Sequence, residues 1–317
     1  MSDVFGLILP LFGLIGLGYL AGRTSTQPLE ALGWLTTFVV YFALPALFFK
    51  LLSTTPVEKL ASVGFIATTI GVTFVIFATT LLIGLATSRG NLAEATIQGL
   101  AGAYGNIGYM GPSIAILALG EAAAVPVALV FCFENILHFV NAPALMALAG
   151  RTREGLGRAI ADVLRKIVLH PFILATMAGV AAAYLGLAPP APIERLIAYL
   201  AQAAAPCALF AMGVTMALRP LKRVPPALAY IVPMKLVVHP VLMYFALEAV
   251  GGLDPVWVHT AVLLAALPTA TNVFVIAQQY GVWVERASAA ILTTTVASVL
   301  TVSALIYAIK TGMLATY

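Results

Sequence analysis

The sequence predicts an all-α polytopic membrane protein with ten transmembrane helices. Three observations lead to this fold class: the composition is apolar, ten long stretches carry few charges or none, and a constant displacement relates the two halves of the chain. Of the 317 residues, 62% are hydrophobic and only 9% are charged, whereas soluble domains carry about 25% charged residues. We therefore expect a chain that is embedded in a lipid bilayer.

Eight stretches contain no Asp, Glu, Lys or Arg, and a helix needs roughly 20 apolar residues to cross a hydrocarbon core about 30 Å thick. Two similar stretches, 122–150 and 224–253, are interrupted by Glu134 and by Lys235 and Glu248. All ten are too long for barrel strands, and lipid cannot satisfy the polar groups of an open backbone, so each is predicted to be a helix. The eight uninterrupted stretches are 4–22, 31–49, 60–88, 95–120, 167–193, 196–218, 255–284 and 287–309.

Basic residues predict the orientation of the chain, because loops rich in Lys and Arg stay in the cytoplasm. Ten spans place both termini on one side, which carries four of the 16 basic residues: Lys50, Lys59, Arg195 and Lys310. The opposite side carries eleven: Arg23, Arg89, Arg151, Arg153, Arg158, Arg165, Lys166, Arg219, Lys222, Arg223 and Arg286. We therefore predict a bacterial inner-membrane protein with both termini outside.

The basic loop at 150–167 is interpreted as a solvated cytoplasmic connection rather than a site for nucleic acid or anionic lipid, so no nucleic-acid partner is predicted. Cys132 and Cys207 fall inside spans without metal-ligand spacing and are interpreted as packing residues. Neither a metal site nor a cofactor is predicted. The first span is expected to remain in the protein, because Asp3 rather than a basic region precedes it.

A displacement of 161 residues relates helix-breaking positions in the two halves, which predicts an internal repeat. Five spans cross the membrane an odd number of times, so the second copy begins on the opposite face. We predict two inverted five-helix repeats, 1–150 and 151–317, a plan that recurs in secondary transporters. The alternative is a duplication without alternating access. The matching pairs are Pro10 and Pro171, Gly18 and Gly179, Pro45 and Pro206, Phe49 and Phe210, and Gly120 and Gly281.

The fourth and ninth spans contain segments that are poor helices. The fourth has Gly105, Gly108, Gly111 and Pro112 within 102–113, and the ninth has a proline within 267–273. Unwound backbone persists in a membrane only where it lines a cavity or contacts protein. Two breaks near the midplane create two half-helix N-termini, each with about half a positive charge, which predicts an anion site. The alternative is a pair of packing kinks.

We predict that the substrate-binding residues come from these two segments and that their crossing holds the anion. They are Asn106, Gly108, Tyr109, Gly111, Pro112, Ser113, Pro268, Thr269, Thr271 and Asn272.

Two spans also carry ionisable side chains, each of which costs at least about 2.5 kcal/mol near the bilayer centre. Glu134, Asn135 and His138 lie in the fifth span, and Lys235 and His239 lie in the eighth. We predict a buried pair of Glu134 and Lys235, in which Lys235 supports the crossing or attracts the anion. Protonation of Glu134 or His138 then couples transport to the proton gradient. The alternatives are a static pair that fixes helix packing, plain facilitated export without a coupling ion and, ranked lower, sodium coupling through unwound carbonyls.

The two interrupted segments resemble signature segments of a known family. Tyr104-Gly-Asn-Ile-Gly-Tyr-Met-Gly-Pro112 and Leu267-Pro-Thr-Ala-Thr-Asn272, with Gln-Gln-Tyr-Gly281 after them, are similar to those of the auxin efflux carriers. Leu44-Pro-Ala46 and the segment 235–240 resemble bacterial members, some of which are described as malonate or malate carriers. The resemblance implies carboxylate substrates and a fold like that of sodium–proton antiporters and bile-acid symporters. It also implies a scaffold of spans 1, 2, 6 and 7 that forms a homodimer, and a moving transport domain of spans 3–5 and 8–10.

The expected function is a secondary transporter that moves a small organic anion, a carboxylate or dicarboxylate, by elevator-type alternating access. The substrate would lie at the crossing of the broken fourth and ninth helices, with H⁺ or Na⁺ as the coupling ion. The alternatives are a non-transporting membrane sensor or receptor for a carboxylate and an anion channel. An enzyme is not expected, because the sequence shows neither a nucleophile with a base at suitable spacing nor an HExxH motif, so no catalytic residue is predicted.

Overall fold

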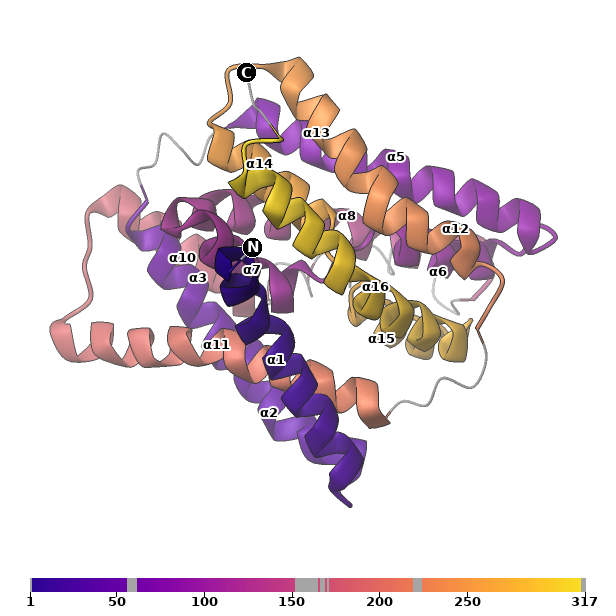
Figure 1. Ribbon diagram of the computed structural model, residues 1–317, viewed down its shortest axis with the longest axis horizontal. Coiled ribbons are helices and arrows are strands. Elements are labelled where there is room, and N and C mark those ends of the chain that lie inside the picture. The colour runs from indigo at the N-terminus through magenta and orange to yellow at the C-terminus, as the bar shows by residue number, and fades with distance from the viewer. Residues whose placement is uncertain are drawn as a thin grey trace. The chain divides into compact units, whose positions relative to one another are not determined.

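The computed structural model describes residues 2–55, 62–151, 165, 169, 171–218 and 224–314. Every regular element in these ranges is helical (Figure 1). An isolated antiparallel bridge joins Gly105 to Thr269. The all-α prediction is thus confirmed for the described part of the chain. Most of the predicted basic loop, at 152–164, lies outside it.

Six helices within the described residues are long and apolar enough to cross a membrane. This finding agrees with a polytopic membrane protein, whereas the number of ten spans and the inversion of the halves stay predictions. The six cover Leu29–Ser53, Val63–Thr87, Glu121–Leu148, Ala191–Leu218, Leu228–Val250 and Val284–Lys310. Shorter apolar helices cover Ile107–Leu119, Ile173–Leu185 and Pro255–Ala265.

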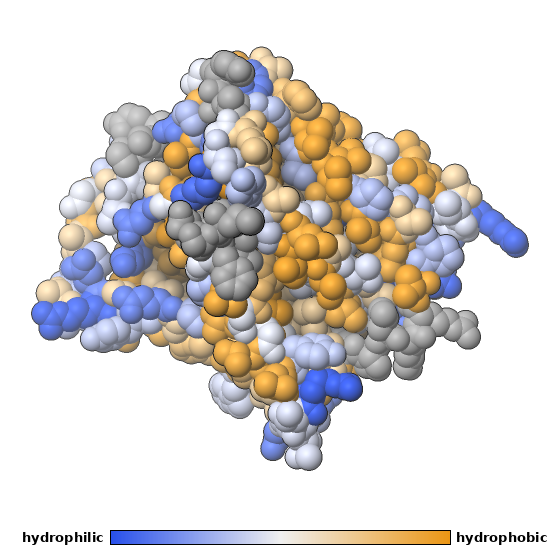
Figure 2. Space-filling model, viewed as in Figure 1, coloured by the Kyte–Doolittle hydropathy of each residue, from blue (hydrophilic) through white to orange (hydrophobic). Residues whose placement is uncertain are grey.

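Large apolar side chains are exposed on helices α13 (His239–Val250) and α16 (Val284–Lys310). Figure 2 shows apolar residues on the surface of the molecule. Phe245 of α13 and Leu300 of α16 are among the exposed large apolar residues. Exposed residues of this size suit a surface that faces lipid, because hydrocarbon imposes no penalty on them.

The chain packs as two compact units. The first unit consists of Met1–Ser62, Gly108–Leu129 and Val168–Pro220, and the second of Val63–Ile107, Val130–Ile167 and Leu221–Tyr317. Each unit is therefore assembled from segments that lie far apart in the sequence. The interrupted segments at 104–106 and 266–271 both belong to the second unit.

The first unit is built on two helix pairs. Helix α1 packs along α11, and α3 packs against α10 and α11 (Figure 1). Its elements are α1 (Ser2–Thr24), η1 (Leu29–Leu32), α2 (Gly33–Phe38), η2 (Val39–Ala43), α3 (Leu44–Ser53), most of α7 (Ile107–Leu119), η3 (Glu121–Ala123), α10 (Pro171–Leu185) and α11 (Ala191–Leu218).

Glycines permit the close approach of the helices in both pairs. A Cβ atom on Gly18 of α1 would lie 2.1 Å from the carbonyl oxygen of Phe210 in α11. A Cβ atom on Gly179 of α10 would lie 3.0 Å from the carbonyl oxygen of Phe49 in α3. The displacement of 161 residues converts one contact into the other, because it takes Gly18 to Gly179 and Phe49 to Phe210.

The second unit packs around a buried apolar cluster. Helix α5 packs against α6 and α13, and α13 packs against α14. The cluster includes Ile76, Leu100, Ile231, Val273 and Ala287. Besides α13 and α16, the elements are α5 (Val63–Thr87), α6 (Leu92–Ala103), α8 (Ala124–Leu148, from Val130 on), α12 (Leu228–Pro233), η4 (Met234–Val238), α14 (Pro255–Ala265) and α15 (Asn272–Tyr280).

Two long helices contain a π-helical turn just before a proline. In the first unit η2 precedes Pro45, and in the second η4 precedes Pro240. A proline offers no N–H to the carbonyl four residues earlier, and that carbonyl belongs to Tyr41 in η2 and to Leu236 in η4. The helix widens where this hydrogen bond is missing. The turn at η4 carries Lys235 and ends immediately before His239.

Candidate functional site

Two helix interruptions meet inside the second unit. Segment 104–106 separates α6 from α7, and segment 266–271 separates α14 from α15. The segments run antiparallel and join through the bridge of Gly105 and Thr269. Backbone polar groups that are released by unwinding therefore find partners in the other interruption, as a nonpolar environment requires.

The crossing is symmetric in its hydrogen bonds. The main-chain N–H of Asn106 donates to the carbonyl of Pro268 at 2.8 Å, and the N–H of Ala270 donates to the carbonyl of Tyr104 at 2.9 Å. A displacement of 164 residues relates the two donors, Asn106 and Ala270, and also the two acceptors, Tyr104 and Pro268. The local displacement at the crossing is thus 164 rather than the 161 that relates Gly120 to the second half.

The position of the first interruption narrows the predicted segment 102–113 to residues 104–106. Pro112 lies inside α7, six residues after Asn106. Its missing N–H removes the hydrogen bond to the carbonyl of Gly108, and α7 nevertheless continues through this position to Leu119. The interruption occurs instead at 104–106, where the second segment supplies hydrogen bonds that compete with helix formation.

Two threonines, one within the second interruption and one in α16, form hydrogen bonds with polar groups of the crossing. The hydroxyl of Thr269 donates to the carbonyl of Ala101 at 2.7 Å. The main-chain N–H of Thr269 donates to the hydroxyl oxygen of Thr294, in α16, at 3.1 Å. Both threonines are fully buried. Because a buried unpaired N–H costs about 1–3 kcal/mol, Thr294 stabilises the non-helical conformation at Thr269.

Lys235 lies at the crossing, where its side chain is fully buried. Its side-chain nitrogen donates to the carbonyl of Ala265, the last residue of α14. The same nitrogen would lie 3.4 Å from a Cβ atom on Gly105 in the first interruption. A positive charge at a helix C-terminus is favourable because the carbonyl ends carry partial negative charge. Lys235 thus contacts the end of one broken helix and adjoins the break in the other.

Helix α8 connects to both interruptions through Tyr104. The Tyr104 hydroxyl donates to the Asn135 side-chain oxygen and accepts from the side-chain nitrogen of Asn272, which is 2.8 Å away. The side-chain nitrogen of Asn135 donates to the carbonyl of Phe131 at 2.8 Å. The ring of His138 stacks on Tyr104 with 4.2 Å between the ring centroids. Asn135 and His138, two of the predicted coupling residues, therefore contact Tyr104 in the first interruption.

The other predicted coupling residues are joined by a threonine that the sequence did not single out. The hydroxyl oxygen of Thr73, in α5, lies 2.8 Å from Oε1 of Glu134 and 3.2 Å from Nε2 of His239. Nδ1 of His239 lies 3.3 Å from Nζ of Lys235. Thr73 is one of many uncharged residues in an apolar span, so neither its charge nor its spacing distinguished it.

The predicted substrate-binding residues fall in both units. The second unit brings together Asn106, Pro268, Thr269, Thr271 and Asn272 around the crossing. Of these, Thr271 precedes α15 without capping it through its side chain. The remaining five lie in α7 and group with the first unit: Gly108, Tyr109, Gly111, Pro112 and Ser113.

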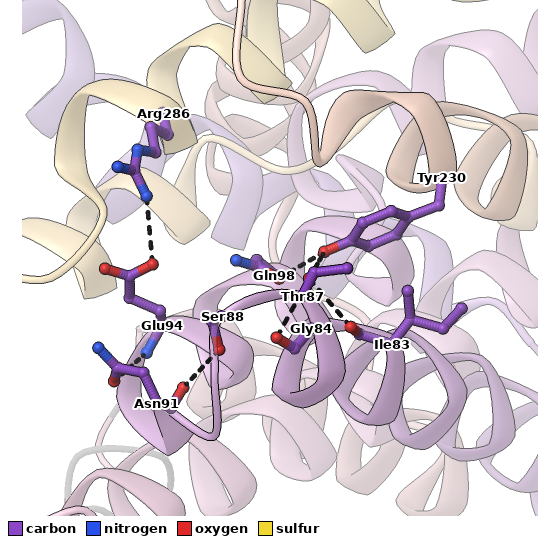
Figure 3. Close-up of polar contacts among 9 residues, drawn as sticks. All are labelled: Ile83, Gly84, Thr87, Ser88, Asn91, Glu94, Gln98, Tyr230 and Arg286. Carbon is purple, nitrogen blue, oxygen red and sulfur yellow. Dashed lines mark hydrogen bonds and ion pairs between the residues drawn. The ribbon is translucent and has the colours of Figure 1, made fainter.

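A second polar cluster lies at the ends of α5, α6, α12 and α16 (Figure 3). The Tyr230 hydroxyl donates to the Gln98 side-chain oxygen and lies 3.2 Å from the Thr87 hydroxyl. Arg286 pairs with Glu94 at 3.1 Å, and the two side chains are 54% and 30% exposed. A pair this exposed contributes little to stability, so we interpret the cluster as a local connection between α6, α12 and α16.

Comparison with known proteins identifies the family. A sequence model of the family described as "Membrane transport protein" matches residues 3–306. A protein of Rhizobium meliloti (strain 1021) described as "Putative malonate transporter" is 64% identical over 314 residues, which are 99% of this chain and 98% of that protein. The predicted resemblance is confirmed: the chain belongs to the membrane transport protein family of the auxin efflux carriers, which is a family of transporters and not of enzymes.

Proposed function

We propose that the protein is a secondary transporter for a small dicarboxylate of the malonate class and that the crossing of the two interruptions holds the anion. The observation that carries this proposal is the pair of symmetric hydrogen bonds at Asn106 and Ala270, which holds both breaks open at one place. The description of the 64% identical relative supports malonate as the first substrate to test.

Electrostatics favour an anion at the crossing. Helices α7 and α15 begin directly after the interruptions, at Ile107 and Asn272. Each helix N-terminus carries roughly half a positive charge, which attracts carboxylates. Lys235 contributes an ammonium group that is shielded from solvent. Because buried charges are screened much less than exposed ones, Lys235 attracts an anion at this place more strongly than a surface lysine does.

The division into two units supports an elevator mechanism. The first unit contains α1, α3, α10 and α11, from the spans proposed as a scaffold, together with most of α7 from the fourth span, and the second contains both interruptions and all the coupling residues. The equivalent contacts of Gly18 with Phe210 and of Gly179 with Phe49 support ten spans in two inverted repeats. We propose that the second unit carries the anion, that the scaffold forms a homodimer, and that both termini lie outside an inner membrane.

A panel of carboxylates tests the proposed function. We expect malonate to raise the unfolding temperature of the purified protein and to drive counterflow in proteoliposomes. The Asn106→Ala and Asn272→Ala variants should lose the stabilisation by malonate while they remain folded. Asn91→Ala is a matched control, because Asn91 caps α6 by accepting from the Glu94 N–H. It should lower basal stability and keep the response to malonate.

Two outcomes contradict the proposal. If malonate stabilises Asn106→Ala and Asn272→Ala as much as it stabilises the parent, the malonate site does not lie at the crossing. Binding of carboxylates without counterflow of any of them would favour a sensor.

The proposed coupling ion is the proton, with Glu134 or His138 as the group that carries it and sodium as the second candidate. In the Glu134→Gln variant the pH dependence of malonate uptake should disappear. Uptake that keeps the pH profile of the parent would leave Glu134 with a static role.

A further inference from the structure

Four side chains form a continuous chain of hydrogen bonds in the second unit. The chain runs from Lys235 through His239 and Thr73 to Glu134, and all four side chains are buried. It crosses between α5 and α13, which run side by side (Figure 1). One end lies at the crossing, where Lys235 contacts Ala265. The other end is a carboxyl group whose Oε2 has no hydrogen-bond partner among the residues that the structure describes.

A charged Lys235 fixes the direction of every bond in the chain. An ammonium only donates, so His239 accepts at Nδ1 and carries its proton on Nε2. Nε2–H then donates to the hydroxyl oxygen of Thr73, and the single proton of that hydroxyl goes to Oε1 of Glu134. Glu134 is ionised in this arrangement.

The same geometry accommodates the opposite direction. A protonated Glu134 donates from Oε1 to Thr73, Thr73 donates to Nε2 of His239, and Nδ1–H of His239 donates to a neutral Lys235 amine. The amine still donates to the carbonyl of Ala265. His239 is neutral in both arrangements. At each link one O–H or N–H bond breaks and another forms, so the net change is one proton moved from Lys235 to Glu134.

We propose that Thr73 and His239 form a proton relay that charges Lys235 when an anion occupies the crossing. This inference rests on the proposed function. An ionised carboxylate with one hydrogen bond is costly in a buried site, which favours the neutral arrangement while the crossing is empty. A negative charge near Lys235 stabilises the ammonium and draws the proton from Glu134. The protein thus acquires opposite charges on Lys235 and Glu134 when it binds its substrate.

Among the described residues, the ionisable groups next to the relay lie on η4, α13 and α8. Helix α5 contributes Thr73 and no ionisable group, while η4 and α13 contribute Lys235 and His239. Helix α8 contributes Glu134 and His138, and Lys235 interacts electrostatically with both. Within the described part of the chain, neither ring nitrogen of His138 has a hydrogen-bond partner. His138 is therefore not a link of the relay.

Infrared difference spectroscopy tests the relay through the carbonyl-stretching band of a protonated carboxylic acid. Malonate should remove this band from the parent, and the band should be absent from Glu134→Gln, which assigns it. Thr73→Val has nearly the same shape but no hydroxyl, so it should bind malonate and lose the change in the band. Thr73→Ser, which restores the hydroxyl, should regain the change.

Thr69→Val is the matched control. Thr69 is buried one turn earlier in α5 and donates to the carbonyl of Ile66, so this variant should respond as the parent does. A malonate-dependent band change in Thr73→Val equal to that of the parent overturns the relay.

Two further outcomes separate the relay from the proposed function. Malonate that stabilises the parent without changing the band overturns the relay and leaves the proposed function standing. Should malonate neither bind nor be transported, the proposed function fails. The relay is then decided without any anion, because it requires a protonated Glu134 in the parent, and a parent spectrum without the Glu134 band overturns it.

Discussion

The side-chain nitrogen of Asn272 lies 2.8 Å from the phenol oxygen of Tyr104, and this contact fixes the orientation of the Asn272 amide. The direction of the hydrogen bond between Asn272 and Tyr104 follows from the carbonyl of Phe131. This carbonyl can only accept, so it receives the amide N–H of Asn135. The Asn135 oxygen then accepts the proton of Tyr104, and Tyr104 must accept from Asn272. The amide of Asn272 thus keeps its oxygen and one N–H for other partners.

Tyr104→Phe should weaken malonate binding. The change removes the hydroxyl that orients Asn272 and leaves the Asn135 oxygen without that donor. A lost buried hydrogen bond costs about 1–3 kcal/mol, and about 1.4 kcal/mol of it transmitted to the site is a tenfold loss of affinity. The dependence of the unfolding temperature on malonate concentration measures this loss.

Tyr230→Phe is the control for this change. Tyr230 donates to Gln98 in the second polar cluster of the same unit, so its loss should lower stability and leave the apparent affinity for malonate unchanged. Equal effects of the two tyrosine variants on affinity would deny Tyr104 an orienting role.

Gly18→Ala should destabilise the first unit. A Cβ atom at this position would lie 2.1 Å from the carbonyl oxygen of Phe210, so α1 and α11 must move apart. Such overpacking costs typically 1–3 kcal/mol. Gly179→Ala should cost less, because its Cβ atom would lie 3.0 Å from the nearest atom, and Gly16→Ala should be harmless, because no described residue has an atom within 4 Å of a Cβ there. Thermal unfolding in detergent ranks the three variants by their unfolding temperatures. A Gly16 variant as unstable as the Gly18 variant would contradict the packing of α1 on α11.

Thr294→Val should destabilise the crossing. The substitution keeps the shape of the side chain but removes the oxygen that accepts the Thr269 N–H, which leaves a buried donor unpaired at a cost of about 1–3 kcal/mol. Thr295→Val is the matched control, since Thr295 is buried in the same helix and donates to the carbonyl of Ile291 in its own helix. Denaturant unfolding compares the two variants, and equal stabilities would mean that Thr294 does not hold the break.

The sequence was sufficient for the fold class because the spacing of charges reflects the cost of placing a charge in lipid. It also located both interruptions to within a few residues. The sequence did not place the break within the predicted segment 102–113, because Pro112 is a strong local signal, whereas 104–106 is held open by partners more than 160 residues away. The sequence of one span does not indicate which distant segment forms hydrogen bonds with it.

The candidate site was predicted best where a residue is costly in a membrane. Glu134, His138 and Lys235 stood out as ionisable groups inside apolar spans, and the structure groups them with the crossing in the second unit. Tyr104 and Thr73 were missed as connecting residues. A tyrosine or threonine is ordinary in an apolar span, and only its position between two other polar groups gives it a role.

Lys235→Met should weaken both the fold and the binding of malonate. The carbonyl of Ala265 loses a buried donor, which should lower the free energy of unfolding by about 1–3 kcal/mol. The anion loses the positive charge at the crossing. Because Lys235 is fully buried, its attraction for the anion is poorly screened by salt, so the loss of affinity should be similar at low and high ionic strength.

Lys50→Met is the control, since Lys50 is exposed near the end of α3, and surface substitutions usually change stability by less than about 0.5 kcal/mol. Malonate titrations at two salt concentrations decide the matter. If high salt abolishes the difference in affinity between Lys235→Met and the parent, the ammonium acts on the anion through solvent, and the malonate site cannot lie at the crossing that Lys235 adjoins.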